Sequence, residues 1–148
     1  MRKYFSTAFG VAFIAALAAA GAATMAAPTI FTPATLHWVA GTGLEKGTYN
    51  AVLAGDPRKA GFYVVRLKLP AGTIFPAHFH NETENVTVIS GTIWVGIGDK
   101  MNKATMKPLG AGSFVIVPAK LHHYALTKVD TVIQIEGIGP ETMATVKP

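Results

Sequence analysis

The sequence predicts an all-β domain, and three observations support this class. Short β-branched and aromatic runs recur from about residue 35 onward, Gly and Pro interrupt them at intervals that suit turns, and no helical period of useful length appears in this part of the chain. A length of 148 residues is enough for one domain with a substantial core, and not for two. A sandwich, a jelly roll and a closed barrel are all open on these grounds.

The first half of the domain contains four predicted strands, at residues 36–40, 48–55, 62–69 and 73–80. The third strand alternates most clearly, because apolar side chains occupy every odd position from Tyr63 to Leu69 while Arg66 and Lys68 lie between them. Asp56-Pro57 opens a turn between the second and third strands, with proline in a position that suits it. This half therefore reads as four short strands, and the third of them has one apolar face.

The second half begins with a predicted hairpin. Two β-branched runs between residues 84 and 98 fold about Ser90-Gly91, and a polar loop is expected at 99–106. Further strands are predicted at 113–118, 122–127 and 130–139. Trp94 and Phe114 are assigned to the core, although either could line a ligand pocket.

The N-terminal segment has the three regions of a secretory signal. Arg2 and Lys3 precede an apolar run from Phe5 to about Ala20, and small residues follow it. Residues 1–26 are therefore predicted to be a signal peptide, cleaved near 22–26, and the mature protein to be periplasmic or extracellular without stable membrane insertion. An uncleaved anchor helix is the alternative, because the apolar run is almost long enough to span a bilayer.

Charge and cysteine content exclude several functions for the mature chain. Removal of the two positive charges of Arg2 and Lys3 lowers the formal net charge from +5 to +3, and the remaining basic residues form no run. A nucleic-acid partner is therefore not expected. The sequence has no cysteine, so neither a disulfide nor a thiolate nucleophile is available.

A metal-binding pattern lies at the end of the fourth predicted strand. His78 and His80 are two residues apart, so they share a face about 6.6 Å apart, close enough for both imidazoles to bind one ion at about 2.1 Å. Glu84 begins the next strand and is the better carboxylate ligand, because Glu82 falls in the turn and should project outward. His122 or His123 could supply a fourth ligand, and only one of two adjacent residues can face inward.

These residues resemble the two motifs of the cupin superfamily. The first motif is Gly, five residues, His-x-His, three or four residues, Glu, six residues, Gly, and every spacing is matched by Gly72, His78, His80, Glu84 and Gly91. The second motif is Gly, five residues, Pro-x-Gly, two residues, His, three residues, Asn. Gly112, Pro118 and His123 fit it, which selects His123 over His122 as the fourth ligand.

The second motif departs at two positions. Lys120 stands where the motif has its turn glycine, and Thr127 stands where it has asparagine. The first departure implies either a left-handed lysine, at a cost of about 1 kcal/mol, or a different turn. It affects the expected local geometry more than the ligand assignment.

The resemblance covers residues 60–137 and implies a cupin jelly-roll barrel, a double-stranded β-helix, with a metal inside near one mouth. The expected organisation is an extension at 27–34, the barrel at 35–140 and a C-terminal tail at 141–148. The expected cofactor is one divalent transition metal, which could be Fe, Mn, Ni, Cu, Co or Zn, and its predicted ligands are His78, His80, Glu84 and His123. The alternative is a hydrogen-bonded polar cluster in a metal-free barrel.

The function expected from this resemblance is that of an exported metal-dependent enzyme. A dioxygenase, lyase, decarboxylase or isomerase acting on a small oxygenated or anionic molecule would fit, with catalytic candidates at Glu82, Lys120, His122 and Tyr124. The alternative for Glu82 and His122 is a solvated surface residue, and for Lys120 an ordinary turn lysine. A non-catalytic module that binds or senses a metal or small ligand is the alternative function. A homodimer, paired through Ile30-Phe31 and the first strand, is also expected.

Overall fold

The computed structural model describes residues 26–41 and 47–147. The predicted signal segment falls almost entirely outside these residues. The chain divides into two units, Met1–Ile30 and Phe31–Pro148, and the strands all belong to the second. Throughout the described ranges the regular secondary structure consists of β-strands alone, which confirms the predicted all-β class.

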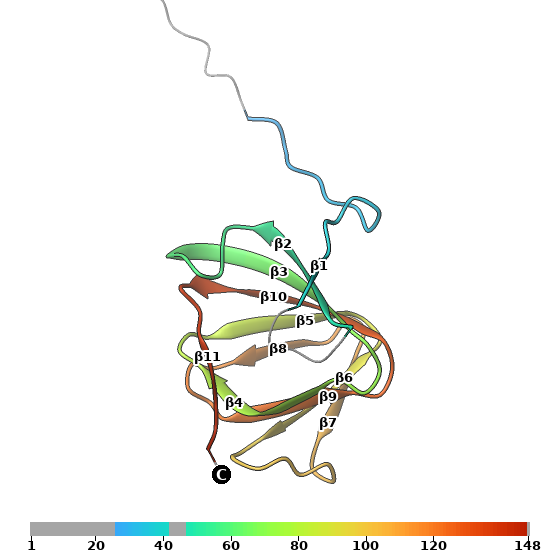
Figure 1. Cartoon of the computed structure of the whole chain (residues 1–148), viewed down its shortest axis with the longest axis vertical. Helices are drawn as coiled ribbons and strands as arrows, with labels where there is room; N and C mark the ends of the chain where they lie inside the picture. Colours follow the sequence, from blue (N-terminus) through green and yellow to red (C-terminus); the bar gives the residue numbers. More distant parts are fainter. Residues whose placement is uncertain (1–25, 42–46, 148) are drawn as a thin grey trace, which may run out of the picture. The chain divides into compact units, whose positions relative to one another are not determined.

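Within residues 26–41 and 47–147, eleven strands form two sheets that lie face to face (Figure 1). The six-stranded sheet has the order β1 (Val39–Ala40), β2 (Tyr49–Ala54), β3 (Gly61–Leu69), β10 (Thr131–Gly139), β5 (Glu84–Ser90) and β8 (Phe114–Val117). The five-stranded sheet has the order β11 (Met143–Thr145), β4 (Ile74–His80), β9 (His123–Thr127), β6 (Thr92–Ile97) and β7 (Lys107–Gly110). All neighbouring strands are antiparallel.

Most predicted strands agree with the structure to within one residue. The hairpin of β5 and β6 turns at Gly91, whose φ of +76° and close approach to the Asp130 carbonyl oxygen exclude a side chain there. The first predicted strand is shorter than expected, since only Val39 and Ala40 pair with β2. Strands β7 and β11 were not predicted, because both are short and neither alternates in sequence.

The main core lies between the sheets and lines part of an interior cavity. Its buried members are Leu69, Val86, Val88, Ile93, Ala125 and Ile133. The alternation predicted for the third strand is confirmed, because Tyr63 and Leu69 are each only 1% exposed and Val65 and Leu67 face the interior cavity. The two sheets are therefore held together by the inward residues of β3, β5, β6, β9 and β10.

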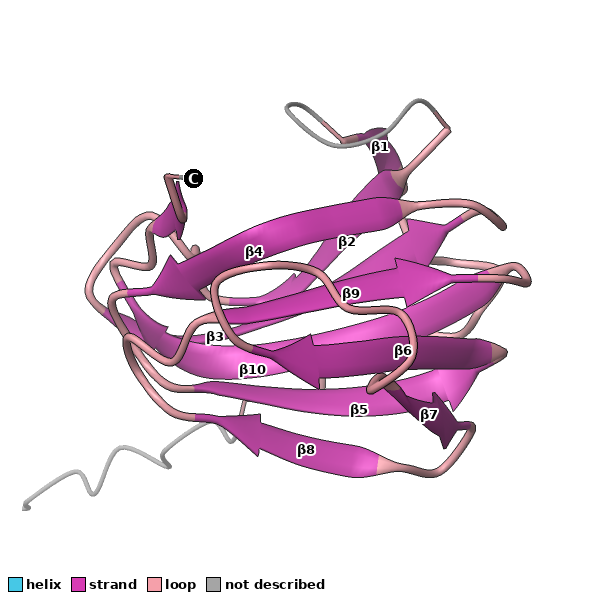
Figure 2. Ribbon diagram, turned by 90° about the horizontal axis from the view of Figure 1, so that it is seen from below, coloured by secondary structure: helices cyan, strands magenta, loops and turns pink. Residues whose placement is uncertain are grey.

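A second apolar cluster covers the outer face of the five-stranded sheet. Tyr124 and Leu126 of β9 pack there with Met106, and Trp94 packs against them, as predicted for a core residue. The loop that connects β6 to β7 crosses over β6 and β9 and covers this cluster (Figure 2). The assignment of Phe114 to the core is wrong. Phe114 is 57% exposed, because Val115 and Val117 are the residues of β8 that face the interior.

Candidate metal centre

A bulge in β4 positions His78 and His80. The register of β4 against β9 shifts between Phe75 and His78, so Phe75 and His78 both face the interior although they are three residues apart. Pro76 lies within the bulge, where a strand tolerates a residue without an N–H. Its carbonyl oxygen is 2.6 Å from Nδ1 of His78. Regular alternation then brings His80 to the same face.

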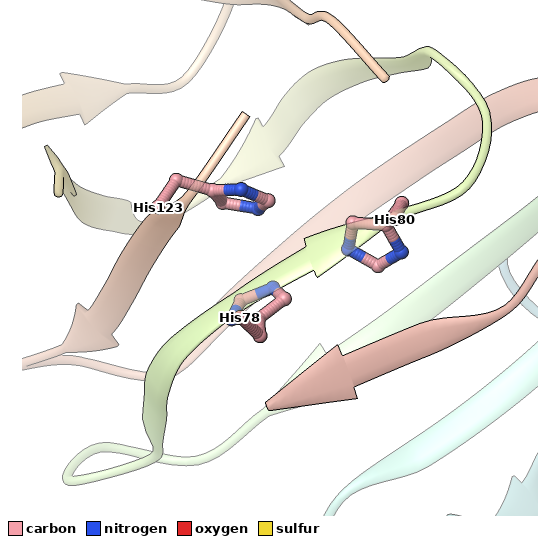
Figure 3. Close-up of side chains that lie close together, drawn as sticks. All are labelled: His78, His80 and His123. Atoms are coloured by element: carbon pink, nitrogen blue, oxygen red, sulfur yellow. The ribbon is translucent and has the colours of Figure 1, made fainter. Parts of the chain in front are cut away.

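His123 completes a cluster of three imidazoles. It is the first residue of β9 and pairs directly with His78 across the sheet. The three side chains project from two neighbouring strands toward a common space (Figure 3). The ring centroids of His78 and His123 are 4.2 Å apart, and one ring nitrogen from each histidine lies within 4.8 Å of the others. This spacing suits three ligands of one ion.

Each Nδ1 atom has a hydrogen-bond acceptor, so the Nε2 atoms are the ones that face the common space. The Leu121 carbonyl oxygen is 2.9 Å from Nδ1 of His123, just as that of Pro76 is close to His78. A carbonyl oxygen can only accept, so Nδ1 carries the hydrogen in both rings. In the neutral tautomer Nε2 then presents a lone pair. These hydrogen bonds therefore make Nε2 the ring nitrogen of His78 and His123 that is available to a metal.

Glu84 supplies a buried carboxylate beside these rings. It begins β5, is 6% exposed and shares its face with Val86 and Val88, as the sequence predicts. Its Oε2 atom is 3.2 Å from Nε2 of His80. Four predicted ligands, His78, His80, Glu84 and His123, therefore line one cavity. Three imidazoles and one carboxylate are a donor set that fits a divalent transition metal.

The cavity has a volume of about 300 Å³, and its lining is divided by chemistry. The histidines and two carboxylates form the polar part. Aliphatic and aromatic side chains from both sheets form the remainder, including Phe75, Val95 and Ile135. A guest in this cavity would find polar contacts beside the histidines and apolar contacts elsewhere.

Burial sets the protonation of the cluster in the absence of a metal. It lowers the pKa of His78 to about 4 and also lowers the pKa of His123, so both rings are neutral at neutral pH. Burial also favours a lower pKa for His80. The hydrogen bond to Glu141 and the charge of Glu84 outweigh this effect, so the pKa of His80 is raised. Burial raises the pKa of Glu84 to about 7, against the opposing effect of His80. A divalent cation would relieve the cost of ionising this carboxylate.

Glu141 belongs to the cavity and was missed by the sequence analysis. It lies between β10 and β11, in the segment assigned to the tail, and its Oε1 atom is 2.6 Å from Nδ1 of His80. His80, Glu84 and Glu141 form a second group whose potential ligand atoms all lie within 4.8 Å of one another. No motif spacing includes this residue, since it is 61 positions from His80.

Three of the predicted catalytic residues lie away from the cavity. Glu82 is exposed in the turn between β4 and β5. His122 stacks on Phe79 with ring centroids 5.0 Å apart and contacts Asp99 through Nδ1 at 2.7 Å. Tyr124 is buried in the cluster outside the five-stranded sheet. Strand alternation already opposes Tyr124, because a residue next to an inward His123 must face outward.

Lys120 is also exposed, and its backbone has the left-handed conformation, one of the two that the sequence predicts. Its φ is +63°, so a lysine occupies the left-handed region where the motif has glycine. Its backbone N–H donates to the carbonyl oxygen of His80 at 2.8 Å, which ties this turn to the end of β4. Lys120 therefore contributes to the position of His80 through its backbone.

Replacing Lys120 with glycine should stabilise the protein relative to replacement with alanine. Both variants lose the charged side chain, but only alanine keeps the steric cost of a positive φ, about 1 kcal/mol. Urea unfolding of the two variants, compared at equal m-values, measures the difference. A Lys120→Ala variant as stable as Lys120→Gly would show that this turn stores no backbone strain.

Comparisons with known proteins agree with the motif assignments. The family model described as Cupin domain matches residues 65–133, which include all four predicted ligands. Germin-like protein subfamily 3 member 3 of Arabidopsis thaliana is 36% identical over 67 residues, which cover 45% of this chain and 32% of that protein. The chain spans between about a third and a half of the length of the curated relatives it matches.

Solved structures share the fold at low sequence identity. The polyketide cyclase RemF from Streptomyces resistomycificus superposes with a TM-score of 0.64 at 16% identity, over 82% of this chain and 87% of that one. An acetylacetone dioxygenase from Acinetobacter johnsonii gives a TM-score of 0.60 at 16% identity, over 80% of this chain and 77% of that one. At such identities the likeness establishes the architecture alone.

Proposed function

Because the chain belongs to the cupin superfamily and has its jelly-roll, double-stranded β-helix fold, we propose that it is an exported metal-dependent enzyme acting on a small oxygenated molecule. His78, His80, Glu84 and His123 would hold one divalent transition metal, drawn from Fe, Mn, Ni, Cu, Co and Zn. The reaction would be of the dioxygenase, lyase, decarboxylase or isomerase type.

One observation carries this proposal. A ligand set of three imidazoles and a buried carboxylate opens onto a cavity of about 300 Å³ that is otherwise largely apolar. A purely structural metal site would be closed by its own ligands and would have no use for such a cavity. The lining instead suits a guest with an apolar body and oxygen atoms at one end.

The protein side chains set the charge at that polar end. Three neutral imidazoles and one carboxylate leave a divalent ion with a net charge of +1, so an anionic or readily enolised group of a substrate would be attracted there. A bound metal would act as a Lewis acid and as a template for the substrate. The apolar wall would exclude water from the rest of the substrate and fix its orientation.

The names of two structural neighbours support this class of substrate. One is a polyketide cyclase, and another is a dioxygenase of acetylacetone, a small diketone. Both names describe proteins whose substrates carry carbonyl oxygens on a carbon skeleton. For this chain we propose a small carbonyl compound of largely apolar character as the substrate.

Metal content and turnover test the proposal together. The full chain, purified without chelator, should contain about one equivalent of a transition metal, and addition of small diketones or keto acids should cause product formation or oxygen uptake beyond one turnover per protein. Bound metal with saturable ligand binding and no turnover would replace the enzyme with a non-catalytic binding or sensing module. Absence of metal even after reconstitution would refute the metal function in both forms.

Export of the mature chain is a further part of the proposal. Among the described residues there is no helix with the length and apolar character needed to cross a bilayer. The sequence pattern of residues 1–26 supports a cleaved secretory signal. Mass spectrometry of the protein recovered from the periplasm or culture medium should give an N-terminus near residues 23–27, and full-length protein in the membrane fraction would favour the anchor helix.

A homodimer is proposed for the mature protein. Within the described part of the second unit, Phe31 is 42% exposed and Val39 in the edge strand β1 is 51% exposed, so an apolar sheet edge is available for a second copy. Light scattering of the mature protein should give twice the monomer mass. A monomer at all accessible concentrations would refute this association.

A further inference from the structure

We propose that Glu141 is a positioning residue of the metal centre, which orients His80 through its Nδ1 atom. The inference rests on the proposed metal function, and it adds a fifth side chain to the four proposed ligands. Oε1 of Glu141 is 2.6 Å from Nδ1 of His80, and the two side chains are 20% and 7% exposed. A short hydrogen bond in a largely dry environment holds the imidazole plane firmly.

His80 differs from the other two histidines in how its Nδ1 atom is held. His78 and His123 donate to carbonyl oxygens two residues earlier in the chain, at Pro76 and Leu121. Their orientation is therefore local to β4 and β9. For His80, the partner of Nδ1 in the described residues is the carboxylate of Glu141, 61 positions later in the chain. A carboxylate acceptor also makes the imidazole a stronger electron donor to a metal.

The backbone around Glu141 is fixed by several hydrogen bonds, so the carboxylate is held in place before any metal arrives. The Glu141 N–H donates to the Pro57 carbonyl oxygen at 2.7 Å. On either side, Asn81 donates to the Pro140 carbonyl oxygen at 2.9 Å and accepts from the Thr142 N–H at 2.6 Å. Strand β11 then pairs with β4, with Met143 opposite His80. The C-terminal segment is thereby attached directly to the histidine strand.

The two carboxylates lie on opposite sides of the His80 ring. Glu141 contacts Nδ1, whereas Glu84 contacts Nε2 at 3.2 Å. An ion bound by Nε2 together with His78 and His123 would lie on the Glu84 side. This arrangement favours Glu84 as a ligand and Glu141 as the group that orients the ligand ring. Direct ligation by Glu141 is the competing assignment, because His80, Glu84 and Glu141 also group closely.

Cobalt binding to the full chain tests this role. The metal-stripped protein is titrated with Co²⁺, and both the dissociation constant and the visible absorption spectrum are recorded. Glu141→Ala should weaken Co²⁺ binding by about 10- to 100-fold and alter the spectrum, because the His80 ring loses its orientation. Glu141→Gln should lose less, since the amide oxygen still accepts from Nδ1.

Thr142→Val provides the matched control. It removes the hydroxyl contact of Thr142 with Asn81, 3.0 Å long, on the same segment and leaves the carboxylate intact. It should lower stability without changing Co²⁺ affinity or spectrum. Equal loss of Co²⁺ affinity in Thr142→Val and Glu141→Ala would show that Glu141 only holds the C-terminal segment against β4 and does not orient the His80 ring.

The remaining outcomes separate the proposals. Wild-type affinity in Glu141→Ala would overturn the role of Glu141 and leave the metal function intact. Glu141→Ala and Glu141→Gln could instead lose the same amount of Co²⁺ affinity, and as much as Glu84→Gln loses. That result would make Glu141 a direct ligand. Absence of Co²⁺ binding by the wild-type chain would overturn the metal function and this inference with it.

Discussion

Replacing either His78 or His123 with alanine is expected to weaken metal binding by about 100-fold or more. Four-ligand sites bind with roughly 10–16 kcal/mol of free energy, so one ligand of four accounts for about 3 kcal/mol. The two residues pair across β4 and β9, and their ring centroids are 4.2 Å apart. Each strand holds its own histidine in place, so the remaining imidazole does not replace the one that is removed. Elemental analysis after gel filtration, and titration with Co²⁺, measure the effect.

His122→Ala is the control for this experiment. His122 neighbours His123 in sequence, but it stacks on Phe79 and contacts Asp99 on the opposite side of the strand. Its removal should leave the metal content unchanged. Thermal unfolding of the metal-free variants checks that all retain the fold. Full metal content in His78→Ala and His123→Ala would show that the ligand set is wrong.

The strands, and the placement of His78 and His80 on one face, were predictable because they depend on local periodicity. Alternation in β3 and β5 identifies the inward face directly, since successive side chains of a strand point to opposite sides. The same rule brings His78 and His80 together and separates His122 from His123. The choice between a sandwich, a jelly roll and a barrel depended on the motif resemblance, because periodicity does not determine how strands are connected.

Features that depend on distant contacts were not predictable. The bulge at Pro76 changes which residues of β4 face the cavity, and alternation alone would have placed Phe75 and His78 on opposite faces. Glu141 reaches His80 only because the chain after β10 is anchored at Pro57 and Asn81. Phe114 could not be assigned without the register of β8 against β5. Each of these follows from tertiary pairing that leaves no local signal.

Metal affinity is expected to fall by about tenfold or more per pH unit as the pH drops below about 7. In the metal-free protein burial raises the pKa of Glu84 to about 7, so a proton occupies this carboxylate at lower pH and must be released when a metal binds. The raised pKa of His80 adds a second competing proton. His78, whose burial lowers its pKa to about 4, competes only in much more acidic solution. Unperturbed histidines would place the loss between about pH 6 and 5.

Dissociation constants for Co²⁺ at several pH values between 8 and 5 test this expectation, with Glu84→Gln as the control. The variant should bind more weakly at pH 8 and show a shallower dependence, because one competing proton is absent. A constant affinity between pH 7 and 5.5 in the wild-type protein would show that Glu84 is already ionised and that its burial is offset by contacts outside this cluster.

Stability should depend on pH differently with and without the metal. The pKa of Glu84 is raised on folding from 4.5 to about 7, so its contribution favours the fold below 4.5 and is lost as the pH rises to 7. The pKa of His78 is lowered from 6.5 to about 4, so its contribution is present above 6.5 and is lost as the pH falls to 4. These two contributions act in opposite directions over nearly the same pH interval, so they offset each other in the metal-free protein. The stabilisation by bound metal should therefore decline steadily from pH 7 to 5, and a difference in melting temperature that stays constant would contradict proton competition at this site.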